Sequence, residues 1–126
     1  MSLPHPAQDA YVSLATFRRD GREVRTPVWI AGSTGRFYVF SAGDAGKVKR
    51  IRANGRARLA TCDMRGNVQS DWLEASARVL SSDSEIATAL KALHNKYGMR
   101  MWLTDVLSKL SGKFRKRAYL EIAVSS

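Results

Sequence analysis

Apolar and polar residues alternate in three short segments near the start of the chain, at 10–18, 24–32 and 36–42. A period of two is typical of β-strands. The residues between the segments, Asp20-Gly21 and the Gly-Ser-Thr-Gly run at 32–35, favour tight turns because glycine tolerates a positive φ. The first third of the chain therefore predicts an antiparallel meander of three strands.

Pro27 interrupts the second of these strands. Proline has no N–H to donate to a ladder, so we expect this strand at a sheet edge or a bulge. Unpaired backbone groups around Thr26, Pro27, Val28 and Trp29 could then lie against a planar ring. The alternative is that Trp29 is simply a core residue, which is the commoner case for a lone strand tryptophan.

The period changes in the segment 43–55, where Val48 and Ile51 belong to one apolar stripe at helical spacing. Asp44 is the expected N-cap of this short helix, and Gly55 is the expected left-handed residue after its end.

The remaining pattern predicts three more strands and two helices. A helix capped by Ser82 or Asp83 and ending at Gly98 comes first, and a second follows directly. The chain therefore predicts a single α+β domain over 1–126, in which six antiparallel strands form a small β-barrel. A short helix follows the third strand and a helical pair precedes the last, with residues 1–9 as a flexible N-terminal segment. The later elements are expected at 56–63 (strand), 68–80 (strand), 82–98 (helix), 99–110 (helix) and 118–124 (strand).

The composition limits the partners and the compartment. The 126 residues carry 21 Lys and Arg against 11 Asp and Glu, a net charge of +10, which implies affinity for an anion without saying whether it is a polymer or a metabolite. Cys62, His5 and His94 have no ligand spacing, so we expect no metal site. A single cysteine and the lack of any secretory pattern or bilayer-long apolar run predict a cytoplasmic protein with no membrane partner.

The basic charge is concentrated between positions 47 and 58, which hold no acidic residue. Lys47 and Lys49 lie in the first turn of the predicted helix, where the helix dipole disfavours cations, so a bound anion would remove a penalty. A solvated cationic surface is the plainer alternative. Nucleic acid is an unlikely partner, because no aromatic residue for base stacking lies between Phe40 and Trp72 and no known nucleic-acid motif is present. The six cations are Lys47, Lys49, Arg50, Arg52, Arg56 and Arg58.

Two ordered stretches carry a resemblance to a known family. They read TFRRDGREVRTPVWI and RFYVFSAGDAGKVKRIRANGRARLATCD. With their T-P-V-W and G-K-V-K-R cores they resemble the pyridoxamine-5′-phosphate-oxidase-like FMN-binding split β-barrel superfamily, and most closely its branch of small oxidoreductases that use the deazaflavin coenzyme F-420. The resemblance covers most of the chain and is strongest from Tyr11 to Asp63. It implies a split barrel that forms a homodimer, with two equivalent cofactor sites at the subunit interface.

The resemblance also assigns cofactor-binding roles by position. The flavin-like ring is expected beside Thr26, Pro27, Val28 and Trp29, and the ribityl chain beside Phe40, Ser41 and Ala42. The phosphate is expected at Gly46, Lys47, Val48 and Lys49, with Arg50 close by. Arg56 and Arg58 are expected to meet the acidic tail that F-420 carries and FMN lacks, with Ala60 on the strand beneath. Trp72 and Trp102 are candidates for closing the site of a second subunit.

The implied activity is hydride transfer between F-420 and a small planar or conjugated substrate. The same fold using FMN, as an oxidase or a flavin reductase, is the first alternative. A non-catalytic module that binds a flavin, haem or nucleic acid is the second. No catalytic residue is identified, because the chemistry would belong to the cofactor. Cys62 is expected to be a buried, inert thiol and His94 a residue of the helix surface.

Overall fold

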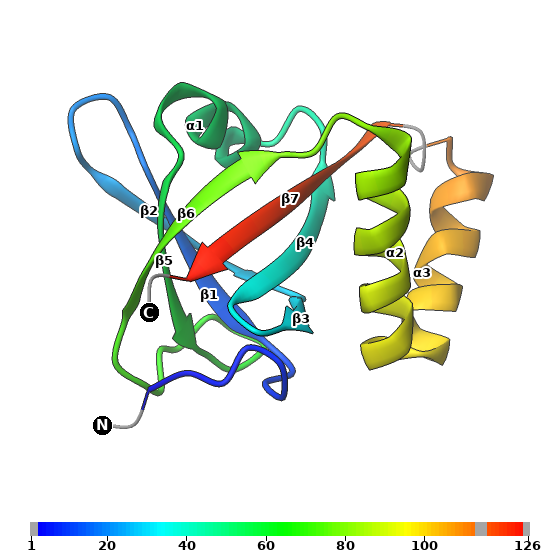
Figure 1. Ribbon diagram of the computed structural model, residues 1–126, viewed down its shortest axis with the longest axis horizontal. Helices are drawn as coiled ribbons and strands as arrows, with labels where there is room; N and C mark the ends of the chain where they lie inside the picture. Colours follow the sequence, from blue (N-terminus) through cyan, green and yellow to red (C-terminus); the bar gives the residue numbers. More distant parts are fainter. Residues whose placement is uncertain (1–2, 113–115, 125–126) are drawn as a thin grey trace.

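The computed structural model describes residues 3–112 and 116–124 (Figure 1). One curled antiparallel sheet of seven strands runs in the order β2-β1-β5-β6-β7-β4-β3. A short helix crosses one end of the sheet, and a helical pair packs beside β4 and β7 (Figure 1). The predicted α+β antiparallel fold is thereby confirmed. The strands are β1 (Val12–Phe17), β2 (Glu23–Val28), β3 (Ala31–Ser33), β4 (Arg36–Ala42), β5 (Arg56–Thr61), β6 (Leu73–Val79) and β7 (Arg117–Val124), and the helices are α1 (Gly46–Asn54), α2 (Asp83–Tyr97) and α3 (Met99–Leu110).

The predicted count of six strands is wrong, because the expected strand at 24–32 divides into β2 and β3. β2 pairs with β1, whereas β3 pairs with β4 at the opposite edge of the sheet. The chain leaves the ladder at Trp29 and Ile30, where the Ile30 N–H donates to the Tyr97 hydroxyl (2.9 Å) instead of to a neighbouring strand. Pro27 lies in β2, an edge strand of the sheet, as its missing N–H requires.

The core fills the concave side of the curled sheet. Val12 and Leu14 of β1 are fully buried there, together with Val39, Leu59 and Leu120 from other strands. The residues of β1 on the opposite face are buried as well, so the alternation of apolar and polar residues in this strand does not mark an exposed face.

Two predicted element starts are corrected by local hydrogen bonds. The long strand expected over 68–80 begins only at Leu73, since the Thr61 N–H donates to the Ser70 hydroxyl (2.8 Å) in place of a ladder bond. Helix α1 begins at Gly46 with Ala45 as its N-cap and no side-chain cap, so the cap expected from Asp44 is wrong.

Other helix ends agree with the sequence. Gly55 is left-handed (φ 71°) and its N–H donates to the Ile51 carbonyl, which ends α1. Ser82 accepts from the Glu85 N–H and caps α2. Within the described residues no helix has the length and apolar character needed to cross a bilayer.

The N-terminal residues are tied to α2 by one half-buried cation. The Lys96 ammonium donates to the carbonyl oxygens of Pro6 (2.7 Å), Asp9 (2.5 Å) and Ile30 (2.5 Å). Burial lowers the pKa of Lys96 to about 8, against an opposing effect of Asp9. The flexibility expected of residues 1–9 stays a prediction, while these contacts show where the segment meets the fold.

Candidate cofactor site

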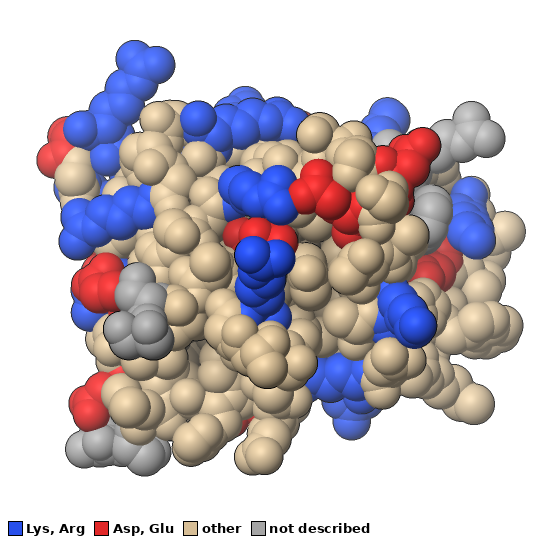
Figure 2. All heavy atoms as spheres, in the orientation of Figure 1, with Lys and Arg blue, Asp and Glu red and all other residues tan. Residues whose placement is uncertain are grey.

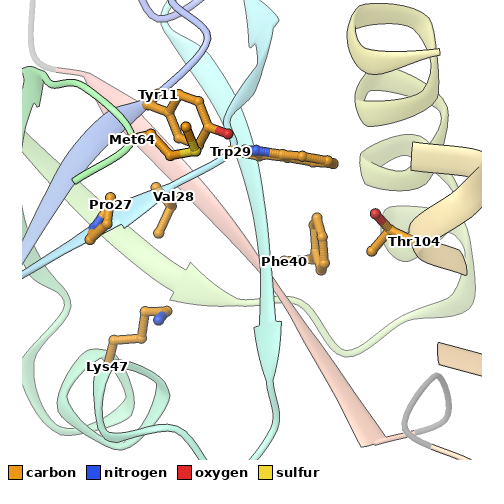
Figure 3. A pocket seen from close by; sticks show the side chains of 8 residues that line it. All are labelled: Tyr11, Pro27, Val28, Trp29, Phe40, Lys47, Met64 and Thr104. Atoms are coloured by element: carbon orange, nitrogen blue, oxygen red, sulfur yellow. The ribbon is translucent and has the colours of Figure 1, made fainter. Parts of the chain in front are cut away.

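A cavity of about 370 Å³ lies where the end of β2, strand β4 and helices α1 and α3 meet (Figure 3). Its walls are largely apolar and aromatic, with one lysine at one end. It is lined by Tyr11, Pro27, Val28, Trp29, Phe40, Lys47, Met64 and Thr104.

Trp29 forms a flat wall of this cavity and is held from behind. Its indole stacks on the Tyr97 ring, with centroids 4.6 Å apart and planes 11° from parallel, and meets the Phe40 ring edge-on at 6.2 Å. The Tyr97 hydroxyl is itself fixed by the Ile30 N–H, and burial raises the pKa of Tyr97 to about 12, so this phenol stays neutral. Trp29 therefore packs against a buried cluster and also faces the cavity.

Lys47 is the one cation among the residues that line the cavity. Its ammonium group extends from α1 toward the space below Val28 (Figure 3). Burial, and after it the charge of Arg50, lowers the pKa of Lys47. A cation that is poorly solvated and repelled by a neighbour is stabilised by an incoming anion, so this end of the cavity suits a phosphate.

Lys49 and Arg50 point elsewhere, into a second hollow of about 280 Å³ between α1 and the β1–β2 hairpin. Arg18 and Arg19 complete its basic lining, and basic side chains crowd this corner at the upper left of Figure 2. The Arg50 Nε donates to the Thr16 hydroxyl (2.7 Å), which ties α1 to β1. Lys49 and Arg50 thus line this second hollow and not the cavity that Lys47 lines, although the charge of Arg50 still acts on Lys47.

Arg56 and Arg58 are engaged within the sheet. The Arg56 guanidinium lies 4.1 Å from the centroid of the Phe17 ring. Arg58 lies over Trp72 at 4.9 Å and forms ion pairs with Glu23 (3.7 Å) and Glu74 (3.5 Å). Neither arginine lines the cavity.

The other predicted residues divide between core and cavity rim. Val48 and Ala60 are fully buried, and the buried Ser41 donates to the Ala42 carbonyl (3.2 Å). At Gly46 a Cβ atom would lie 2.6 Å from an Arg50 terminal nitrogen, so a larger residue would displace that side chain.

Thr26 and Arg58 are the predicted site residues that keep a buried polar atom without a hydrogen-bond partner among the described residues, and for Thr26 this atom is the hydroxyl oxygen. Strand alternation puts Thr26 on the same face of β2 as Val28, which lines the cavity. Thr26 itself is not among the residues that line the cavity, so its hydroxyl is not assigned to a ligand contact.

Three lining residues were missed by sequence reasoning. Tyr11 precedes β1, Met64 lies in the turn after β5, and Thr104 comes from α3. Only the folding of the chain brings these positions to one cavity, and none of them carries a local motif.

The chain belongs to the pyridoxamine 5′-phosphate oxidase family, whose model matches residues 6–126. No curated protein is detectably similar to it in sequence. HutZ, the haem storage protein from Vibrio cholerae, has the same fold, with a TM-score of 0.70 at 14% identity over 96% of this chain and 85% of its own.

Two further solved structures share the fold. An FAD-binding protein from Mesorhizobium loti is 18% identical, with a TM-score of 0.62 over 95% of this chain and 82% of its own. The conserved hypothetical protein Rv2991 from Mycobacterium tuberculosis is 16% identical, with a TM-score of 0.68 over 95% and 76%. The family includes oxidoreductases, and the neighbours include both flavin-binding and haem storage proteins.

Proposed function

We propose that this protein is an oxidoreductase that holds a phosphorylated flavin-type cofactor in the cavity beside Trp29, with coenzyme F-420 as the first candidate and FMN as the alternative. The observation that supports this most directly is the pairing of a flat aromatic wall with a single, poorly solvated cation, Lys47, in one cavity. A planar ring and an anionic phosphate need these two features together.

Each feature has a role in this proposal. Lys47 binds the phosphate, and Trp29 and Pro27 orient the ring. When bound, the cofactor supplies hydride transfer to a small planar or conjugated substrate. The chain contributes position and the exclusion of water, and no side chain has to change its protonation state.

Fewer observations bear on the choice between F-420 and FMN than on the position of the cofactor site. Arg56 and Arg58, which the resemblance assigns to the acidic tail of F-420, are engaged with Phe17, Glu23 and Glu74. The sequence resemblance and the net charge of +10 continue to favour the more anionic cofactor.

Haem, which the Vibrio cholerae neighbour is described as storing, has less support. Neither described histidine lines the cavity, and the His94 ring is bonded to Asp105 (2.6 Å). A non-catalytic module therefore ranks behind the two flavin-type readings.

We further propose that the protein is a homodimer in which a second copy closes the cavity. Pro27 and Met64, which line it, are exposed, Met64 to 70%. An open, apolar site of this kind gains affinity when a partner surface excludes water from it. Light scattering at micromolar protein should give a mass near twice 14.0 kDa.

Parallel titrations with F-420, FMN and haemin test the proposed cofactor. We expect micromolar or tighter binding of F-420, weaker binding of FMN, and quenching of Trp29 fluorescence by the bound ring. A Trp29→Leu variant should lose the quenching. Tight binding of haemin with no binding of either flavin-type cofactor would overturn the proposal, and tight binding of FMN alone would decide for the alternative.

A further inference from the structure

Helix α3 exposes a continuous apolar face. Met99, Leu103, Leu107 and Leu110 follow each other at spacings of three and four and Trp102 adjoins Leu103, which places all five on one side of the helix. α3 is the outermost element of the molecule and packs against α2 (Figure 1). The exposed side chains are Met99 (82% exposed), Trp102 (60%), Leu103 (52%), Leu107 (58%) and Leu110 (81%).

The opposite face of α3 fixes this orientation. Met101 is fully buried against α2, and Asp105 is buried between the His94 ring (2.6 Å) and the Arg117 guanidinium (2.7 Å). Arg117 also donates to the Ser108 hydroxyl (2.9 Å). Turning the apolar face inward would break this network, so the face stays directed outward.

The exposed charged residues of α3 have one sign. Arg100 and Lys109 are exposed on α3, and Lys116 is exposed beyond its end. The only acidic residue of the helix, Asp105, faces inward. An apolar face that includes a tryptophan and is flanked by cations is typical of helices that lie in the interface of an anionic membrane.

We propose that α3 docks on an anionic lipid surface, with its axis in the plane of the membrane and its apolar face among the acyl chains. A direct contact between the α3 helices of two copies fits this face less well. A symmetric pair of α3 helices would bring the basic flanks of two copies together, and like charges across an interface repel. One helix face also offers less than the roughly 800 Å² that each partner of a stable dimer usually buries.

This inference revises the expectation of no membrane partner, and it does not depend on the identity of the cofactor. Because Thr104 of the same helix lines the cavity, docking would hold the cavity close to the lipid headgroups.

Sedimentation with vesicles tests the proposal. The probes are vesicles of phosphatidylcholine alone and of phosphatidylcholine with 40% phosphatidylglycerol. The double variant Leu103→Gln/Leu107→Gln removes apolar contact, and Arg100→Gln/Lys109→Gln removes charge. The matched controls are Leu3→Gln, which alters an exposed leucine outside α3, and Arg36→Gln/Arg52→Gln, which removes two exposed cations elsewhere.

We expect wild type to bind the anionic vesicles and not the neutral ones, and brominated lipids to quench Trp102. Each α3 variant should bind about tenfold more weakly, while each control binds as wild type. Light scattering of the variants should show an unchanged oligomeric state. The proposal is overturned if wild type fails to bind anionic vesicles at low salt, if the controls weaken binding as much as the α3 variants, or if Leu103→Gln/Leu107→Gln dissociates an oligomer without changing vesicle binding.

Discussion

The Trp29 indole and the Tyr97 phenol lie stacked 4.6 Å apart, although they come from the end of β2 and the end of α2. The Tyr97 hydroxyl also accepts from the Ile30 N–H and donates to the Ala10 carbonyl (3.0 Å). Tyr97 therefore holds three parts of the fold in place. Its ring supports Trp29 in the cavity wall, and its hydroxyl bonds both Ile30, where the chain passes from β2 to β3, and Ala10, just before β1.

Two substitutions at Tyr97 should separate the contribution of its hydrogen bond to Ile30 from that of its ring stack on Trp29. Tyr97→Phe keeps the ring stack but leaves the buried Ile30 N–H without its acceptor, which should lower the free energy of unfolding by about 1–3 kcal/mol. Tyr97→Ala also removes the ring and should cost about 3–5 kcal/mol. Urea unfolding followed by circular dichroism measures both values. Tyr38→Phe is the control and should change stability by less than about 0.5 kcal/mol. Equal losses in Tyr97→Phe and Tyr38→Phe would contradict this account.

The sequence predicts the local elements well because their causes are local. The stripe of Val48 and Ile51, the left-handed Gly55 and the Ser82 cap each depend on residues within one or two turns. The division of the second strand at Trp29 could not be predicted in this way. It depends on Tyr97, which lies far along the chain and supplies the acceptor that replaces a ladder bond.

Three residues that line the cavity, Pro27, Val28 and Trp29, could be grouped from the sequence because they are contiguous in the chain. Arg56 and Arg58 show why the surroundings of the other predicted residues could not be inferred from the local sequence. Strand pairing places Arg58 directly opposite Glu74, and the same strand carries Arg56 to the Phe17 ring. Glu74 forms an ion pair with Arg58, and Arg56 packs on the Phe17 ring, so two arginines of the basic segment have partners within the fold.

Lys47 and Lys49 should differ in their effect on cofactor binding although they are two residues apart on one helix. Lys47 lines the cavity and Lys49 does not, so Lys47→Ala should weaken F-420 or FMN binding about ten- to a hundredfold, the size expected for a charged hydrogen bond. Lys49→Ala should change the affinity less than about threefold. Isothermal titration measures the affinities, and the melting temperature of the apo protein should be unchanged in both variants. A similar loss in the two variants would show that the phosphate lies over the second hollow instead.

Arg50 should act on stability more than on binding. Its Nε bonds the Thr16 hydroxyl, which is buried in β1, so Arg50→Met should lower the free energy of unfolding by about 1–2 kcal/mol. Lys49→Met on the neighbouring position is the matched control and should stay within about 0.5 kcal/mol. In a double-mutant cycle with Thr16→Val, the coupling energy between the two residues should be about 0.5–1.5 kcal/mol. A coupling energy near zero would mean that the bond contributes nothing to the fold.

Cys62 should be unreactive in the folded protein and should make stability depend on alkaline pH. The side chain is buried, and this burial, with Asp63 and Asp9 adding to it, raises the pKa of Cys62 from 9.0 to about 11. The folded state then favours the protonated thiol, so the stabilisation is complete below about pH 9 and is lost as the pH rises toward about 11. Other groups titrate in the same range, and the difference in unfolding free energy between wild type and Cys62→Ala isolates this one. That difference should be constant up to about pH 8.5, and above this pH the unfolding free energy of wild type should fall relative to that of Cys62→Ala.

Alkylation by iodoacetamide at pH 8 should be slow for the native protein and fast in urea. Rapid native alkylation at that pH would show that the thiol is accessible and ionises normally.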